Sequence, residues 1–134
     1  MATRFHATVE APIRPKIKEH LARDDVDERS TTVVLGALQN ATRVFRNDVS
    51  ETINAITSNS GDGITFDQLA PYASGVRTKK MWQETGDFND AMWSCGQSVG
   101  LISDIPTCAA LIQRIVREAE SQIKSASSCI GSRL

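Results

Sequence analysis

The sequence contains few of the residues that build metal sites or activate nucleophiles. Its 134 residues include two histidines, His6 and His20, and three cysteines, Cys95, Cys108 and Cys129. Neither histidine has cysteine, aspartate or glutamate near it in a pattern typical of zinc ligands. A nucleophile, a base and an orienting acid are hard to assemble from so few histidines. We therefore predict no metal site and no catalytic residue in this chain.

The sequence also lacks an excess of charge of one sign and any long apolar run. Fifteen Lys and Arg residues face 16 Asp and Glu residues, which gives a formal charge of −1. That balance provides no electrostatic basis for binding nucleic acid or an anionic membrane. Apolar runs such as Val33–Leu35 are far shorter than the roughly 20 residues of a membrane span. The first residues have no apolar segment typical of a secretory signal, and the odd number of cysteines favours a reducing compartment. We expect a cytoplasmic domain.

Helical periodicity is the strongest positive signal. Apolar residues recur at steps of three and four from 31 to 57 without a proline, which predicts a long amphipathic helix with Ser30 as its N-cap. A second long helix is expected to begin near Thr107, after a proline, and to reach about Ser125. Shorter helices are expected over 16–22, 65–73 and 76–85.

The polar side of the first long helix would carry Asn40, Arg43 and Asn47. Asparagine is a poor helix former, and an exposed face more readily carries Glu or Lys. Their presence therefore indicates hydrogen bonds to a neighbouring element, with a merely solvated face as the alternative.

Only one segment favours a β-strand. Residues 3–9 mix β-branched and aromatic types. Because one strand cannot form a sheet, either this segment is irregular or its partners lie outside the sequence. The expected fold class is mainly α, with one short N-terminal strand.

Five stretches of the sequence, taken in order, carry a family resemblance. They are MATRF, APIRPKIK, DERSTTVVLGALQNATRVFRNDVS, LAPYASGVR and ETGDFNDAMWSCGQSVGLISDIPTCAALIQRIVREAE. Together they resemble the C-terminal part of the nitronate monooxygenase (2-nitropropane dioxygenase-like) family, which includes FMN-dependent NAD(P)H:quinone reductases. The resemblance runs from Met1 to about Ile123.

The resemblance implies part of a (β/α)₈ flavin barrel, a fold that is complete at ~250 residues. Residues 1–10 would be the end of a late barrel strand, and 11–90 the helical substrate-domain insertion. Residues 91–134 would be the closing segment and C-terminal helix of the barrel. Most of the barrel and the family's catalytic histidine would then precede Met1, so we do not expect the chain to be active or to retain FMN alone.

The resemblance also implies site residues. Ala2 and Thr3 would contact the FMN phosphate, although the family usually has glycine where this chain has Ala2. Ser94, Gly96 and Gln97 would belong to the wall beside substrate and flavin. For this segment, tight helix packing at Gly96 and Gly100, with Ser94 as a helix cap, is the alternative interpretation.

Two functions of different classes follow. In the first, the chain is part of an FMN-dependent oxidoreductase that oxidises an alkyl nitronate with O₂, or NAD(P)H with a quinone, and its partner is the missing barrel half. In the second, it is a non-catalytic helical module that self-associates through apolar helix faces, because large exposed apolar surfaces seek a partner.

Overall fold

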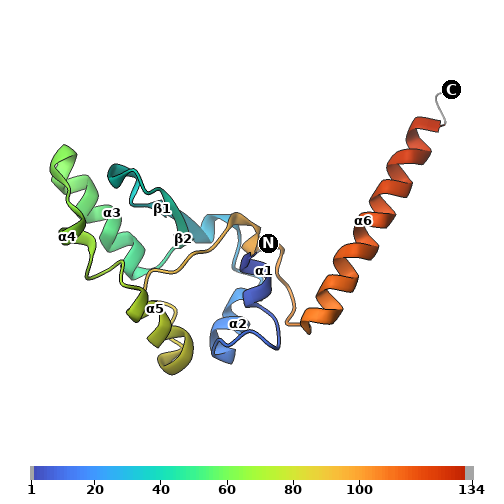
Figure 1. Ribbon diagram of the computed structural model, residues 1–134, viewed down its shortest axis with the longest axis horizontal. Helices are drawn as coiled ribbons and strands as arrows, with labels where there is room; N and C mark the ends of the chain where they lie inside the picture. The colour runs from blue at the N-terminus through green and yellow to red at the C-terminus, as the bar shows by residue number, and fades with distance from the viewer. Residues whose placement is uncertain (1, 132–134) are drawn as a thin grey trace.

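The computed structural model describes residues 2–131, and these are mainly helical (Figure 1). The elements, in chain order, are α1 (Ala2–His6), α2 (Pro15–Leu21), η1 (Glu28–Ser30), β1 (Thr31–Val34), η2 (Gly36–Leu38), β2 (Thr42–Phe45), α3 (Asp48–Ser60), η3 (Gly61–Gly63), α4 (Phe66–Leu69), α5 (Gly75–Lys80), η4 (Met81–Thr85), η5 (Gln97–Leu101) and α6 (Cys108–Gly131). Here η4 is a π-helical turn that continues α5, and the other η elements are 3₁₀ turns. The expected mainly α class is confirmed, as are the shorter helices, of which α4 covers only part of 65–73.

β1 and β2 form an antiparallel hairpin where we predicted a helix over 31–57, so that prediction is wrong. All four residues of β1 are β-branched, which favours a strand. The connection places Leu35 and Gln39 in the left-handed region, with φ of 60° and 57°, and a continuous right-handed helix cannot include them. The side chain of Ser30 accepts from the backbone N–H of Asp27 and so caps the turn η1 instead of a long helix.

α3 begins only at Asp48, because Asn47 is its N-cap. The Asn47 Oδ1 atom accepts from the backbone N–H of Ser50 at 2.9 Å. Its Nδ2 group donates to the carbonyls of Phe88 at 2.6 Å and Ala91 at 2.8 Å. Asn47 is 6% exposed. One buried amide therefore starts a helix and holds a loop that lies 41 to 44 residues away.

The predicted polar helix face does not exist. Asn40 is exposed before β2, whereas Arg43 lies in β2 and its Nη1 atom donates to Thr31 Oγ1 at 3.0 Å. The expected hydrogen bonds to a neighbouring element are made by Arg43 and Asn47, within the chain.

The predicted N-terminal strand over 3–9 is also wrong, because residues 2–6 form the helix α1. The hydroxyl of Thr8 donates to the carbonyl of Phe5 at 2.8 Å, and Arg4 donates to the carbonyl of Ala7 at 3.1 Å. A helical turn pairs its own backbone groups, whereas a strand without a neighbour would leave them unpaired. Tertiary context thus outweighs the β-branched composition.

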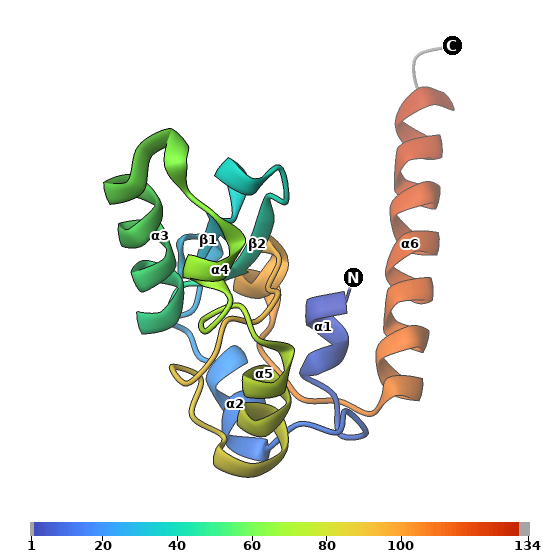
Figure 2. The ribbon, with the colours of Figure 1, turned by 60° about the vertical axis from the view of Figure 1, so that its left-hand side comes forward.

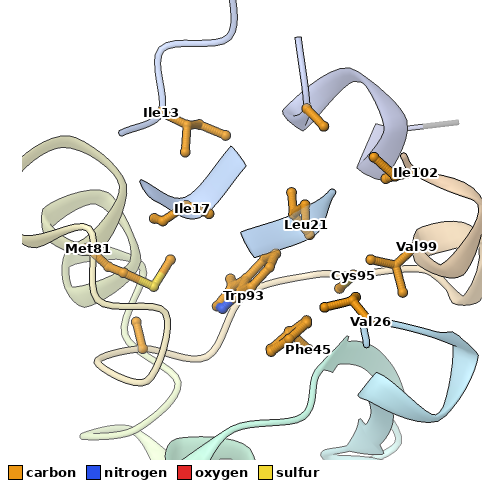
Figure 3. Close-up of a cluster of buried hydrophobic side chains, with 12 residues drawn as sticks. Ile13, Ile17, Leu21, Val26, Phe45, Met81, Trp93, Cys95, Val99 and Ile102 are labelled. Carbon is orange, nitrogen blue, oxygen red and sulfur yellow. The ribbon is translucent and has the colours of Figure 1, made fainter. Parts of the chain in front are cut away.

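Two apolar clusters lie on opposite faces of the hairpin, since neighbouring side chains of β2 point in opposite directions. Phe45 belongs to the first cluster and Val44 to the second. The first cluster (Figure 3) consists of Ala7, Ile13, Ile17, Leu21, Val26, Phe45, Met81, Ala91, Trp93, Cys95, Val99 and Ile102. The second consists of Val34, Leu35, Val44, Val49, Ile53, Ile64 and Leu69. Because the first cluster takes residues from 1–10, 11–90 and 91–134, all three predicted segments share one core.

α6 confirms the predicted second long helix, and it extends away from the other elements (Figures 1 and 2). Its first turns are attached through Asp104, which pairs with Arg4 of α1 and with Arg114 of α6, the latter at 2.7 Å. Leu111 is buried at 2% exposure. The α6 stripe, defined by Ile112, Val116 and Ile123, is 51%, 51% and 67% exposed.

The two roles of Asn47 can be separated by substitution. Asn47→Ala removes the cap and leaves two buried carbonyls without their donor, and we expect a loss of about 3 kcal/mol in the free energy of unfolding. Asn47→Asp keeps the cap acceptor but sets a carboxylate against the same carbonyls, so it should also destabilise. Urea denaturation measures both, and the exposed Asn40→Ala should change stability by less than about 0.5 kcal/mol. Wild-type stability of Asn47→Asp would show that the bonds to Phe88 and Ala91 contribute nothing.

Candidate functional site

The segment Trp93–Cys95 is held along the free edge of β2. The backbone N–H of Phe45 donates to the carbonyl of Trp93 at 3.1 Å, and that of Cys95 donates to the carbonyl of Arg43 at 3.2 Å. Val44 and Ser94 are bridge partners in this antiparallel pairing. Strand-like alternation follows, with Trp93 and Cys95 buried at 2% and 1% exposure. Ser94 between them is exposed. The pairing with β2 therefore determines that the Ser94 side chain points to the exposed side.

The structure brings together two segments that the sequence placed at the site. The hydroxyl oxygen of Thr3 in α1 accepts from the backbone N–H of Gly96 at 2.9 Å, across 93 positions. Thr3 is 6% exposed. Ala2 and Gln97 are exposed. The predicted phosphate contact of Ala2 and Thr3 stays a prediction.

Glycine is required for close packing after this segment. A Cβ atom at Gly100 would lie 3.0 Å from Cα of Asp27 and 3.2 Å from the backbone nitrogen of Glu28. At Gly96 it would meet Thr3 Oγ1 at 3.5 Å, an ordinary contact. The turn η5 is thus pressed against η1 at Gly100, while Gly96 faces α1.

The thiol of Cys95 is not a reactive group. Burial raises its pKa to about 12 and outweighs the lowering of the pKa by a hydrogen bond with Thr3. Since the thiolate is the nucleophilic form, this cysteine is a packing residue.

Ser94 lines a pocket of about 560 Å³ beside the first cluster. Its lining residues are Pro12, Ala73, Gly75, Thr78, Lys79, Trp82, Gln83, Met92, Trp93 and Ser94. We call this space the Trp82–Trp93 pocket. Of the predicted site residues, Ser94 lines it, while Ala2, Thr3, Gly96 and Gln97 do not. The other walls of the pocket were not predicted from the sequence, in which their clearest signal was a tryptophan inside the predicted helix 76–85.

The π-helical turn η4 presents Trp82 and Gln83 to this pocket. The turn ends at Gly86, whose φ is 66°. The backbone N–H of Arg14, just before α2, donates to the carbonyl of Trp82 at 2.8 Å, and its guanidinium donates to the carbonyl of Glu84 at 3.1 Å. π-helical turns within helices are frequent at functional sites, and here the turn is fixed from outside by Arg14.

Aromatic rings support the pocket from the core side. Trp93 stacks on Phe45 with centroids 4.8 Å apart, and His20 stacks on Phe88 at 3.8 Å. Figure 3 shows Trp93 among Ile17, Leu21 and Phe45. Burial lowers the pKa of His20, with a smaller lowering by Arg23, which favours a neutral ring within this stack. The rigid backing fixes Trp93 as a pocket wall.

Other kinds of site find little support between residues 2 and 131. No group of three or more His, Cys, Asp or Glu side chains there could hold a metal ion. Across the same residues, no helix is long and apolar enough to cross a membrane.

The fold of this chain is similar to part of the fold of larger proteins of known structure. No family model matches the chain. It is similar to the structure of FabK from Thermotoga maritima, with 25% identity, a TM-score of 0.79 and coverage of 94% of this chain and 38% of FabK. A point mutant of that FabK gives 22% identity, a TM-score of 0.67, and coverage of 94% and 34%. The chain thus spans little more than a third of the FabK chains, and it shares their fold over nearly all of its own length.

The contact between Thr3 and Gly96 can be tested by removing its acceptor. Thr3→Val keeps the shape but leaves the Gly96 N–H without a partner, so we expect a loss of about 1 kcal/mol in unfolding free energy. We also expect Cys95 to be alkylated faster in the folded variant, because the segment that buries it loosens. Thr3→Ser keeps the hydroxyl and serves as the control. Equal alkylation rates in Thr3→Val and Thr3→Ser would contradict the contact.

Proposed function

We propose that the chain is the substrate-side part of a flavin-dependent oxidoreductase and is not active alone. The observation that carries the proposal is the hydrogen bond from Gly96 to Thr3, which joins the two segments implied to lie at the flavin. Ser94, two residues before Gly96, faces a pocket of ligand size. The likeness to FabK, a flavin-dependent enzyme, supports the same class.

The residues of this chain could form one wall of an FMN site, but they do not form a whole site. Ser94 is an exposed polar group on the segment that pairs with β2, and Gln97 is exposed at the start of η5, which suits the edge of a flavin site. Thr3 is buried and Ala2 is exposed, so Ala2 is the more accessible of the two to a phosphate group. When bound in the complete fold, the flavin would carry the electron transfer. This chain's residues would bind and orient the substrate.

The reaction we propose is the oxidation of a small substrate, either an alkyl nitronate with O₂ or NAD(P)H with a quinone. Both come from the family resemblance of the sequence. The apolar walls Trp82, Met92 and Trp93 would exclude water from the substrate. Ser94 would orient it by a hydrogen bond.

The α6 stripe supports a partner for this chain. Half or more of the surface of Ile112, Val116 and Ile123 is exposed along one side of α6, whose buried residue Leu111 lies in its first turn. Burying such side chains stabilises an interface by roughly 25 cal/mol per Å². We propose that the remaining barrel of the enzyme covers the stripe, and self-association through it is the competing outcome.

Co-expression with the part of Thermotoga maritima FabK that this chain does not match tests the proposal. We expect the two to copurify with stoichiometric FMN, seen as yellow colour, and the chain alone to be colourless. Ile112→Asp with Val116→Asp should abolish copurification, because two charges replace the apolar stripe, while the exposed positions leave the chain folded. A separate variant of this chain, Gln113→Asp, adds a charge at an exposed position of α6 outside the stripe and serves as the control.

Three results would contradict the proposal. One is tight, stoichiometric FMN binding by the chain alone. Another is failure to copurify while size-exclusion chromatography shows a dimer that the double substitution dissociates, which would favour the self-association module. The third is a complex that forms without FMN.

A further inference from the structure

The Trp82–Trp93 pocket has one charged side chain in its lining, Lys79. The other described residues of the lining are apolar or carry neutral polar groups, and no carboxylate is among those described. A ligand in this pocket therefore meets a positive charge that no acid of the lining neutralises.

Lys79 differs in this respect from the basic residues beside it in α5. The guanidinium of Arg77 donates to the carbonyls of Asp90 and Pro71, both at 3.1 Å. Lys80 faces a different pocket, which it shares with Arg77 and Asp90. The side chain of Lys79 is exposed and makes no hydrogen bond or ion pair with any residue that the structure describes. Its ammonium group is available to a ligand.

The rest of the pocket lining suits a ligand with an apolar part. Trp82, Met92 and Trp93 form extended apolar walls. The hydroxyl of Thr78 is already engaged, since it donates to the carbonyl of Met92 at 2.7 Å. At about 560 Å³ the pocket lies within the range of small-molecule sites.

We propose that Lys79 determines the specificity of this pocket, selecting a small amphiphilic anion whose acid group meets the ammonium while its apolar part lies between Trp82 and Trp93. This deepens the proposed function, on which it rests for the reaction but not for the binding. If Lys79 has this role, the substrate carries a negative charge beside an apolar group, and a neutral quinone is the poorer ligand.

The size of the preference follows from the exposure of Lys79. An ion pair at an exposed ammonium is weak and is screened by salt. We therefore expect about fivefold tighter binding of an acid than of its neutral analogue, with the preference decreasing as salt is added.

The chain carries its own reporter for the experiment. Its two tryptophans, Trp82 and Trp93, both line the pocket, so intrinsic fluorescence reports occupancy of this pocket and not of the α6 stripe. The purified full chain is titrated without flavin with octanoate, below its micelle concentration, and with octanamide. Lys79→Gln removes the charge, Lys79→Arg restores it, and Lys80→Gln is the matched control on the adjacent position. Circular dichroism confirms that each variant is folded.

We expect octanoate to bind about fivefold tighter than octanamide to the wild type, to Lys79→Arg and to Lys80→Gln. Lys79→Gln should bind both equally. The inference is overturned if neither compound changes the fluorescence, if the wild type shows no preference, or if Lys79→Gln keeps the preference. Because no flavin is present, failure here leaves the flavin proposal standing, and failure of copurification with FMN leaves this result unaffected.

Discussion

The fold depends on the pairing of the β2 edge with residues 93–95. Two backbone hydrogen bonds, from Phe45 to Trp93 and from Cys95 to Arg43, add a short third segment to a two-stranded hairpin. A hairpin alone is marginally stable, and further strands or packing are needed to secure it. The pairing also sets the alternation that buries Trp93 and exposes Ser94. The same backbone register therefore places Trp93 in the core and Ser94 at the candidate site.

Asn47 and Thr3 extend this arrangement to the helices. Asn47 joins the start of α3 to the loop before Trp93, and Thr3 joins α1 to the residue after Cys95. Both contacts are between distant parts of the sequence, so the site segment is held at each end by a side chain. The pocket then forms between this segment and η4, which Arg14 holds. Its shape is thus a product of tertiary contacts, as is its single charge at Lys79.

Local signals in the sequence predicted the helices that have clear limits. α6 follows Pro106, and the helix formed by α5 and η4 ends at Gly86, a residue suited to its positive φ. The hairpin was missed because its apolar residues also fit steps of three and four, and nothing local reveals the left-handed Leu35 and Gln39. Ser94 could be placed at a site by resemblance. Trp82 and Lys79 could not, because their position depends on how the turn η4 packs against the rest.

Amide hydrogen exchange of the purified chain tests the β2 pairing most directly. The N–H groups of Phe45 and Cys95 make the two hydrogen bonds that join this segment to the hairpin. We predict that both are protected to the same extent and lose protection together as denaturant is added, because they open as one unit. Exchange of Cys95 at the rate of an unstructured peptide, with Phe45 protected or not, would contradict the account.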